Sequence, residues 1–267
     1  MDERKKAILK AIIDNYIQSA EPVGSKALAG QPGLDLSSAT LRNEMAALEA
    51  MGFLEQPHTS AGRVPTPSGY RVYVDELMPR HDLTAGEQDK MNQIKKLRMA
   101  ELDSLLNRAG KIIAELTRTV TVAAAGGLGP QRVSGPGHSD DQAQCTLSDV
   151  REEQIYISGE ANLLDYPEFQ DLLRARRTLE YITEQRAALI RHTPVWEREG
   201  IRVVIGPENV AAELSDASVL MATYPMGGGM RGMIGVVGPT RMDYSRMVSR
   251  LGYFAEKLKE MTYEETE

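Results

Sequence analysis

The order of short segments in the first 78 residues restricts the possible folds of this chain more than any other feature. Apolar spacing, turn residues and cap residues predict a helix, a short helical segment, a turn, a longer helix, two strand-like runs and a last helix. In chain order these segments lie at residues 8–16, 25–29, 30–33, 38–51, 53–56, 63–66 and 67–78. Thr66 caps the last helix, and Pro67 occupies its first position. This order is that of a winged helix-turn-helix.

The third helix of this region has two different faces, and Ser37 or Ser38 is its N-cap. An apolar stripe that begins at Leu41 is predicted to point into the domain. The opposite face is mostly alanine and carries Asn43, with Thr40 and Arg42 at its flanks. Small side chains allow close approach to a groove floor, and Asn and Arg can pair with adenine, guanine or phosphate. Alanine is also the best helix former, so DNA contact and simple helix stability remain alternatives.

The loop between the two strand-like runs offers a second set of polar groups. It carries hydroxyl, imidazole and guanidinium groups without a carboxylate, and Gly62 permits a tight turn. Such groups suit contact with phosphate or the minor groove, and an ordinary polar hairpin is the alternative. The predicted DNA-binding residues are Lys26, Ser38, Thr40, Arg42, Asn43, His58, Thr59, Ser60 and Arg63.

The charge balance argues against purely electrostatic DNA binding. The chain has 31 Lys and Arg against 38 Asp and Glu, a net charge of −7, and residues 23–74 contain four basic and four acidic residues. Non-specific attraction to DNA is therefore expected to be weak, so base readout has to carry more of the discrimination.

The composition indicates a soluble, cytoplasmic protein, and the lack of a visible Ser-His-Asp arrangement predicts that it is not an enzyme. Hydrophobic residues make up 42% of the chain, but no run approaches the ~18 apolar residues of a membrane helix, and no signal peptide is visible. The single Cys145 excludes an intramolecular disulfide and fits a reducing compartment. The four histidines share no ligand spacing, so neither a metal site nor a cofactor is predicted.

The rest of the chain divides into a long helix, a linker and an α+β region. Residues 83–118 read as one helix with a short heptad seam, which either joins two chains or lies on its own domain. Gly and Pro at 126–144 predict a flexible linker, and from Ile155 onward strand-like and helix-like runs alternate. The run GPTRMDY at 238–244 is either a functional site or a strand-to-helix turn. The predicted domains are 1–79, 80–125, 126–150 and 151–267, and the predicted dimer contacts are Leu102, Leu105, Ile112 and Leu116.

Several long motifs of this chain resemble those of one family. The N-terminal motifs are EPVGSKAL at 21–28, LSSATLRNEMAALEAMGFL at 36–54 and PHTSAGRVPTPSGYRVYVDEL at 57–77. The C-terminal motifs are NLLDYPEF at 162–169, IGPEN at 205–209 and GVVGPTRMDYSRM at 235–247. Together they resemble HrcA, the heat-inducible transcription repressor of bacterial chaperone operons. The resemblance implies a dimeric repressor that binds an inverted-repeat operator, called CIRCE, through its winged helix. It also implies that the GroEL chaperonin keeps the repressor competent to bind.

The middle of the chain departs from the plan of that family. The resemblance implies a GAF-like α+β domain into which a helical dimerising domain is inserted. The stretch between Leu116 and Ile155 is too short for this plan, so a reduced GAF-like domain with about four strands is expected. The chain is either a compact member or has lost an internal piece, and the long helix is the obvious substitute dimer contact. A ligand-sensing α+β protein, whose winged helix serves protein interaction, is the alternative to a DNA-binding repressor.

Overall fold

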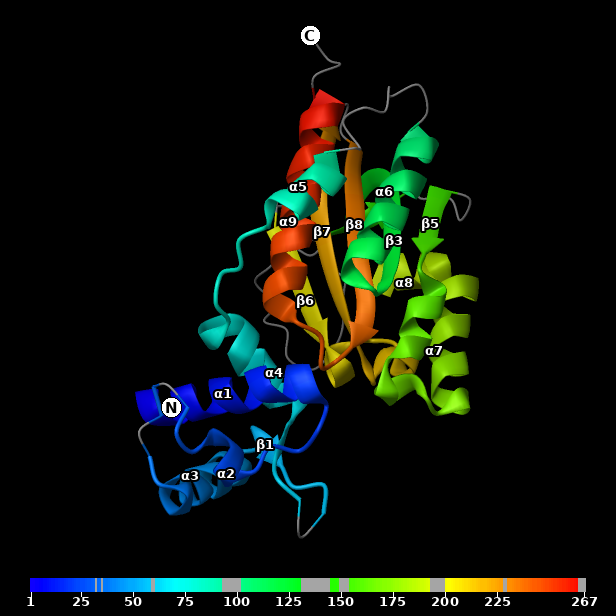
Figure 1. Cartoon of the computed structure of the whole chain (residues 1–267). Coiled ribbons are helices and arrows are strands. Elements are labelled where there is room, and N and C mark those ends of the chain that lie inside the picture. The colour runs from blue at the N-terminus through cyan, green and yellow to red at the C-terminus, as the bar shows by residue number, and fades with distance from the viewer. Residues whose placement is uncertain are drawn as a thin grey trace. The chain divides into compact units, whose positions relative to one another are not determined.

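The structure, a computed structural model, describes residues 1–31, 33–34, 36–58, 61–92, 102–130, 145–148, 154–192, 200–227 and 230–263. The chain forms two compact units (Figure 1). Unit 1 comprises Met1–Arg80 together with Thr240–Ser245, and unit 2 comprises His81–Pro239 together with Arg246–Glu267. The long helix, linker and α+β region that the sequence separates thus belong to one unit.

Unit 1 has the segment order of a winged helix. Its elements are α1 (Glu3–Ser19), α2 (Ser25–Leu28), α3 (Ser38–Ala50), β1 (Leu54–Glu55), β2 (Val64–Pro65), α4 (Pro67–Val72) and the π-helical turn η1 (Tyr73–Leu77). β1 and β2 pair antiparallel as a short ribbon. Apolar side chains from the helices and the ribbon close one core, which includes Ile8, Leu9, Ile12, Ile13, Leu28, Leu41, Leu48, Leu54 and Tyr70. The predicted winged helix-turn-helix is confirmed.

Side-chain caps explain where two helices of unit 1 begin. Ser37 accepts a hydrogen bond from the backbone N–H of Thr40 (3.1 Å), and Thr66 accepts one from Gly69 (3.1 Å). Each bond satisfies an N–H that the first turn of a helix leaves without an intrahelical partner. Of the two predicted cap candidates for α3, Ser37 is the cap and Ser38 is the first helical residue.

Residues 240–245 pack as part of unit 1, although they lie far along the chain. Arg241 donates from Nη1 to the carbonyl of Ile17 in α1 (2.8 Å). The ring of Tyr244 lies 5.8 Å from that of Tyr70 in α4. The GPTRMDY run is therefore more than a turn between a strand and a helix, because it contributes contacts to the winged-helix unit.

Unit 2 is a mixed α+β body built on one antiparallel sheet. Its helices are α5 (Ala85–Asn92), α6 (Leu102–Thr117), α7 (Leu172–Glu184), α8 (Arg186–His192) and α9 (Tyr244–Tyr263), with short 3-10 turns η4 (Glu160–Asp165), η5 (Pro167–Phe169), η6 (Gly206–Glu208) and η7 (Ala212–Leu214). Its strands are β3 (Val120–Pro130), β4 (Cys145–Ser148), β5 (Ile155–Ser158), β6 (Gly200–Ile205), β7 (Ala217–Gly227) and β8 (Met230–Pro239).

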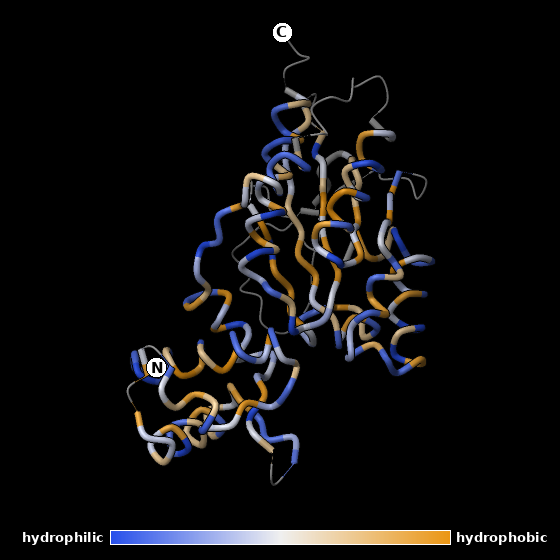
Figure 2. The backbone as a smooth tube through the Cα atoms, in the orientation of Figure 1, coloured by the Kyte–Doolittle hydropathy of each residue, from blue (hydrophilic) through white to orange (hydrophobic). Residues whose placement is uncertain are grey.

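The strand order of the sheet is β4-β3-β8-β7-β6. β5 pairs with the first half of β3 and β4 with the second half, so the two share one edge of that strand. α6 and α9 lie over one face, and α7 and α8 lie toward the other (Figure 1). On the second face, Val122 packs in one cluster with Phe169 and Ile182. Figure 2 shows hydrophobic residues along the central strands β7 and β8, where the sheet is buried.

The predicted single helix over 83–118 is wrong. Residues 85–92 and 102–117 are helical, and the residues between them lie outside the described part of the chain. Lys90 on α5 pairs with Glu115 on α6 at 3.4 Å. A straight helix would hold residues 25 positions apart at roughly 37 Å, so the two helices fold back on each other. The periodicity of each half is helical, and no signal in the sequence marked the reversal between them.

Residues 120–130 form a strand, β3, where the sequence predicts the end of a helical region and the start of a linker. β3 pairs with β8 from Val120 opposite Val237 to Gly127 opposite Met230. The sheet of unit 2 contains six strands among the described residues, instead of the expected four or so. Small residues at 123–127 carry no alternation of apolar and polar side chains, so the strand was missed.

α6 uses its apolar side inside unit 2. Leu105 is 3% exposed and Ala109 is fully buried, because the helix packs against β3 and β5. Ile112 and Leu116 are half-buried, and the side chain of Leu102 lies outside the described residues. A second chain could not pack on Leu105 without displacing the sheet. Of the predicted dimer contacts whose side chains are described, only Ile112 and Leu116 are therefore partly accessible to a second chain.

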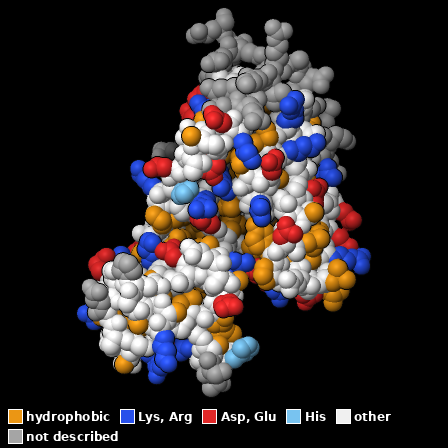
Figure 3. All heavy atoms as spheres, viewed as in Figure 1, with side chains coloured by type: hydrophobic (Ala, Val, Ile, Leu, Met, Phe, Trp, Pro, Cys, Tyr) orange, Lys and Arg blue, Asp and Glu red, His pale blue; other side chains and the backbone are white. Residues whose placement is uncertain are grey.

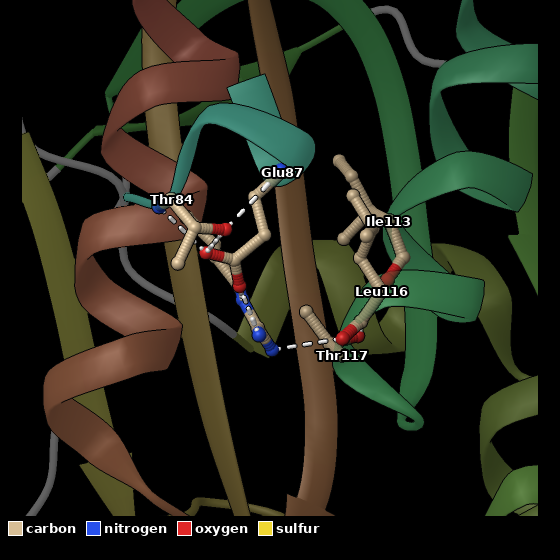
Figure 4. A network of polar contacts seen from close by, with 6 residues as sticks. Thr84, Glu87, Ile113, Leu116 and Thr117 are labelled. Carbon is tan, nitrogen blue, oxygen red and sulfur yellow. Dashed lines mark hydrogen bonds and ion pairs between the residues drawn. The ribbon is translucent and has the colours of Figure 1, made fainter. Parts of the chain in front are cut away.

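Arg250 on α9 bonds to residues of α5 and α6, and so links three helices of unit 2. Figure 4 labels two of its partners, Glu87 and Leu116. Arg250 donates from Nη1 to the carbonyl of Leu116 at the end of α6 (2.8 Å) and from Nε to Glu87 on α5 (3.0 Å). The other oxygen of Glu87 accepts from the N–H and the hydroxyl of Thr84, both at 2.9 Å, which completes a capping box. The backbone N–H of Thr84 and the guanidinium of Arg250 lower the pKa of Glu87 to about 2.

Candidate nucleic-acid interface

α3 presents the two faces that the sequence predicts. Leu41 and Leu48 are fully buried, whereas Arg42, Asn43 and the alanines at 39, 46 and 50 are exposed. Among the described residues, neither Arg42 nor Asn43 makes a hydrogen bond or an ion pair. The core contacts therefore fix the rotation of the helix and leave one arginine and one asparagine on a surface of small side chains.

Ser38 and Thr40, two of the predicted DNA-binding residues, have partners at the start of α3. The hydroxyl oxygens of Ser38 and Ser25 lie 2.9 Å apart, and those of Thr40 and Ser37 also lie 2.9 Å apart. Because Ser25 is buried in α2, the first bond links the two helices of the helix-turn-helix. Both predicted residues thus help to fix the position of α3.

The base of the ribbon is bonded to the segment before α2. Val23 and Arg63 exchange two backbone hydrogen bonds, each of 2.9 Å. A Cβ atom at Gly62 would lie 2.4 Å from the carbonyl carbon of Val23, so only glycine permits this approach. The sequence predicts only a tight turn at Gly62, because the partner in this contact is 39 positions away along the chain.

Arg63 lies at the base of the ribbon and not at its tip. Its Nη2 is 2.8 Å from the Glu49 carboxylate of α3, and its side chain is only 17% exposed. The guanidinium therefore holds the ribbon against α3, and its charge is compensated within the protein. His58, near the tip, is exposed, while Thr59 and Ser60 lie outside the described residues.

A cleft of about 440 Å³ lies between α2, α3 and the ribbon. Lys26 lines it from α2, Arg42 from α3 and Arg63 from the ribbon. The structure thus brings together three of the predicted DNA-binding residues, which come from three separate stretches of the sequence. The cleft is open to solvent on the side of Lys26 and Arg42, which are both exposed.

The balanced charge of this region hides a local excess of positive charge. Both acidic residues of α3 are used within the unit, since Glu44 pairs with Lys5 (3.1 Å) and Glu49 pairs with Arg63. Lys26 and Arg42, the exposed cations at the cleft, have no acidic partner among the described residues. In Figure 3, basic side chains gather over α2 and α3. A polyanion is the class of partner that this surface attracts.

Within the described residues, no group of three or more His, Cys, Asp or Glu side chains is placed to hold a metal ion. None of the described helices combines the length and the apolar character needed to cross a membrane.

Two family descriptions match this chain and together cover more than half of it. Residues 1–76 match the winged helix-turn-helix transcription repressor domain described as HrcA DNA-binding. Residues 139–248 match the HrcA protein C terminal domain. The first match falls on the winged helix of unit 1, and the second covers much of unit 2 together with residues 240–245 of unit 1.

Whole-chain comparisons agree with these matches. A protein from Acetivibrio thermocellus named heat-inducible transcription repressor HrcA is 32% identical over 336 residues, which cover 97% of this chain and 96% of that protein. A protein of the same name from Moorella thermoacetica is 33% identical over 336 residues, which cover 97% of each chain. Because these alignments exceed 267 residues, the relatives carry internal residues that this chain lacks. A crystal structure of a hypothetical protein covers 99% of both chains, with a TM-score of 0.73 at 22% identity, and supports the fold alone. The chain belongs to the HrcA family, whose curated members are named heat-inducible transcription repressors.

Proposed function

We propose that this protein represses transcription of chaperone genes by binding an inverted-repeat operator of the CIRCE type. One observation carries the proposal: the outward face of α3 combines small side chains with the exposed Arg42 and Asn43, beside a cleft lined by cations. α3 lies in the major groove, and the ribbon contacts the adjacent backbone. The names of the relatives support a repressor and not an enzyme.

Operator binding is tested directly by fluorescence anisotropy with a CIRCE duplex and a scrambled duplex of equal composition. A specific reader is expected to prefer the operator by at least about 1,000-fold. Equal affinity for both duplexes would contradict the proposal. It would leave the ligand-sensing alternative, in which the winged helix serves protein interaction.

Arg42→Ala and Asn43→Ala are each expected to weaken operator binding by about 1–3 kcal/mol. Each side chain is exposed on the outward face of α3, where it can reach base edges. Competition with operators changed at single base pairs should show relaxed preference at one position for each variant. Arg71→Ala on α4 is the control, because Arg71 pairs with Asp75 and lies outside the cleft. If both α3 variants bind like the parent, α3 is not the reading helix.

Lys26→Ala is expected to weaken binding to every duplex alike and to lower the salt slope by about one unit. Lys26 is an exposed cation at the cleft, and a lysine that neutralises a phosphate releases one counterion. Affinity measured from low to moderate salt gives the slope. An unchanged slope with altered base preference would assign Lys26 to a base edge instead.

The active repressor is proposed to be a cytoplasmic homodimer whose competence depends on the GroEL chaperonin. An inverted repeat presents two identical half-sites, and a protein with two-fold symmetry matches them. The winged helix alone offers too small a surface for tight binding to one half-site. The chaperonin part rests on the family resemblance, and it is tested by measuring operator binding of the refolded chain with and without GroEL.

A further inference from the structure

We propose that residues 240–245 are a positioning element through which unit 2 sets the operator affinity of unit 1, an inference that rests on the proposed function. This coupling segment, Thr240–Ser245, belongs to unit 1, whereas Pro239 before it and Arg246 after it belong to unit 2. Residues 1–80 therefore do not make up the whole winged-helix unit. The remaining part is supplied by a stretch of chain that continues into β8 of unit 2 on one side and into α9 on the other.

Arg241 of the coupling segment completes the C-terminal end of α1. The N–H four positions after Ile17 belongs to Glu21, and it donates to the hydroxyl of Ser19 (3.1 Å) instead of to the helix. The carbonyl of Ile17 accepts from the guanidinium of Arg241 (2.8 Å). The last turn of α1 contains no basic residue, so Arg241 also supplies the positive charge that stabilises this end of the helix.

Two further contacts make the coupling segment part of unit 1. Tyr244 is fully buried, and its ring lies 5.8 Å from that of Tyr70 in α4. Ser245, also buried, donates from its hydroxyl to the carbonyl of Pro79 (2.5 Å). These contacts fix the backbone on the C-terminal side of Arg241, so the guanidinium is presented to α1 in one position.

α1 connects this cap to the reading helix. It packs against α3, and Lys5 near its N-terminal end pairs with Glu44 of α3 (3.1 Å). None of the residues 240–245 lines the cleft that Lys26 and Arg42 line. The coupling segment therefore acts on operator binding through α1 and α3, and not as a DNA contact of its own.

Hydrogen exchange of the full chain without DNA tests the cap. Arg241→Ala is expected to speed exchange in the last turn of α1 by about fivefold, because a helix end that loses a bonded cation opens more often. Arg241→Lys keeps the charge and a donor, so it should restore most of the protection. Arg177→Ala removes the same charge from an exposed side chain of unit 2 and should exchange like the parent. Unchanged exchange in Arg241→Ala would overturn the role of Arg241 as the cap.

Operator binding, measured where circular dichroism shows every variant folded, separates positioning from stability. Arg241→Ala is expected to raise the operator Kd by about fivefold, the low end of couplings between distant sites. The salt slope should not change, because no phosphate contact is lost. A lowered slope would make Arg241 a phosphate contact, and a Kd equal to that of the parent would remove the link to α3. A parent without operator preference would contradict the proposed function instead, and the exchange result would stand.

Heating tests whether unit 2 controls the coupling segment. Arg250→Met removes the cation that pairs with Glu87 inside unit 2, and it is expected to lower the temperature at which operator binding is lost by roughly 5 °C or more. Lys90→Met, which removes a pair with the exposed Glu115, should leave that temperature unchanged. If Arg250→Met unfolds earlier by circular dichroism but releases the operator at the same temperature as the parent, control by unit 2 is overturned.

Discussion

Replacing Arg250 with Met is expected to lower the free energy of unfolding of unit 2 by about 3 kcal/mol. The variant leaves Glu87 without its cation and the carbonyl of Leu116 without its donor. Removing one partner of a buried pair costs about 3–5 kcal/mol, and the 13% and 14% exposure of these side chains favours the lower end. Urea unfolding followed by circular dichroism measures the loss, and hydrogen exchange assigns it to unit 2.

Lys90→Met is the matched control for Arg250→Met. Lys90 also links α5 to α6, through Glu115, but the two side chains are 54% and 72% exposed. A change below about 0.5 kcal/mol is expected for such a surface pair. Similar losses in both variants would show that any polar link between these helices matters equally, and the special role of Arg250 would be rejected.

The pH dependence of the free energy of unfolding is an independent test of the contact between Arg250 and Glu87. The pKa of Glu87 is about 2 in the folded chain, against an ordinary value of 4.5. A lowered folded-state pKa means that the ionised carboxylate stabilises the fold above about pH 4.5, and that this stability is lost as the pH falls toward 2. The difference in stability between the parent and Arg250→Met should shrink over that range. A constant difference down to about pH 3 would show that Glu87 does not mediate it.

Gly62→Ala is expected to lower the stability of unit 1 by about 3 kcal/mol and to weaken operator binding strongly. The added Cβ would lie 2.4 Å from the carbonyl carbon and oxygen of Val23, which are backbone atoms and cannot rotate away. The two Val23–Arg63 hydrogen bonds must then lengthen or break. Overpacking of this kind costs about 1–3 kcal/mol, and the lost bonds add to it.

Gly24→Ala is the control for Gly62→Ala, because Gly24 lies beside the same contact. A Cβ at Gly24 meets no atom within 4 Å, and its φ of −91° is allowed for alanine. Its stability should change by less than about 1 kcal/mol. Thermal unfolding and operator binding should therefore separate the two variants. If they behave alike, close approach of the ribbon is not the reason for glycine at position 62.

Local signals were sufficient to predict the order of the helices and strands within residues 1–80 of unit 1. Helix starts are marked by cap residues such as Thr66, and apolar spacing identified the inward face of α3 from Leu41 onward. These signals act within a few residues, where sequence reasoning is strongest. Unit 2 depends on pairings between distant strands. β3 lacks alternation and is defined by its partner β8, so the sequence did not distinguish it from a linker.

The sequence predicts those parts of the candidate interface that depend on local signals, and it does not predict those that depend on contacts between distant residues. The exposure of Arg42 and Asn43 follows from helix periodicity, which the sequence carries. The position of Arg63 follows from its pairing with Val23 and Glu49, which are distant in the sequence. The residue type indicates that an arginine near the wing could bind phosphate. Only the fold shows that the guanidinium of Arg63 is already paired with the carboxylate of Glu49.

The pairing of β3 with β8 also determines when a newly made chain can finish folding. β3 leaves the ribosome roughly one hundred residues before β8, an interval of roughly 5–20 s at ordinary rates of synthesis. During translation, β5 and β4 can cover one edge of β3, while the other edge waits for residues 230–239. An unpaired edge on a nascent chain invites aggregation. We therefore expect the yield of folded protein to depend on how well the cell protects incomplete chains from aggregation. The amount of folded protein would then report on the folding capacity of the cell.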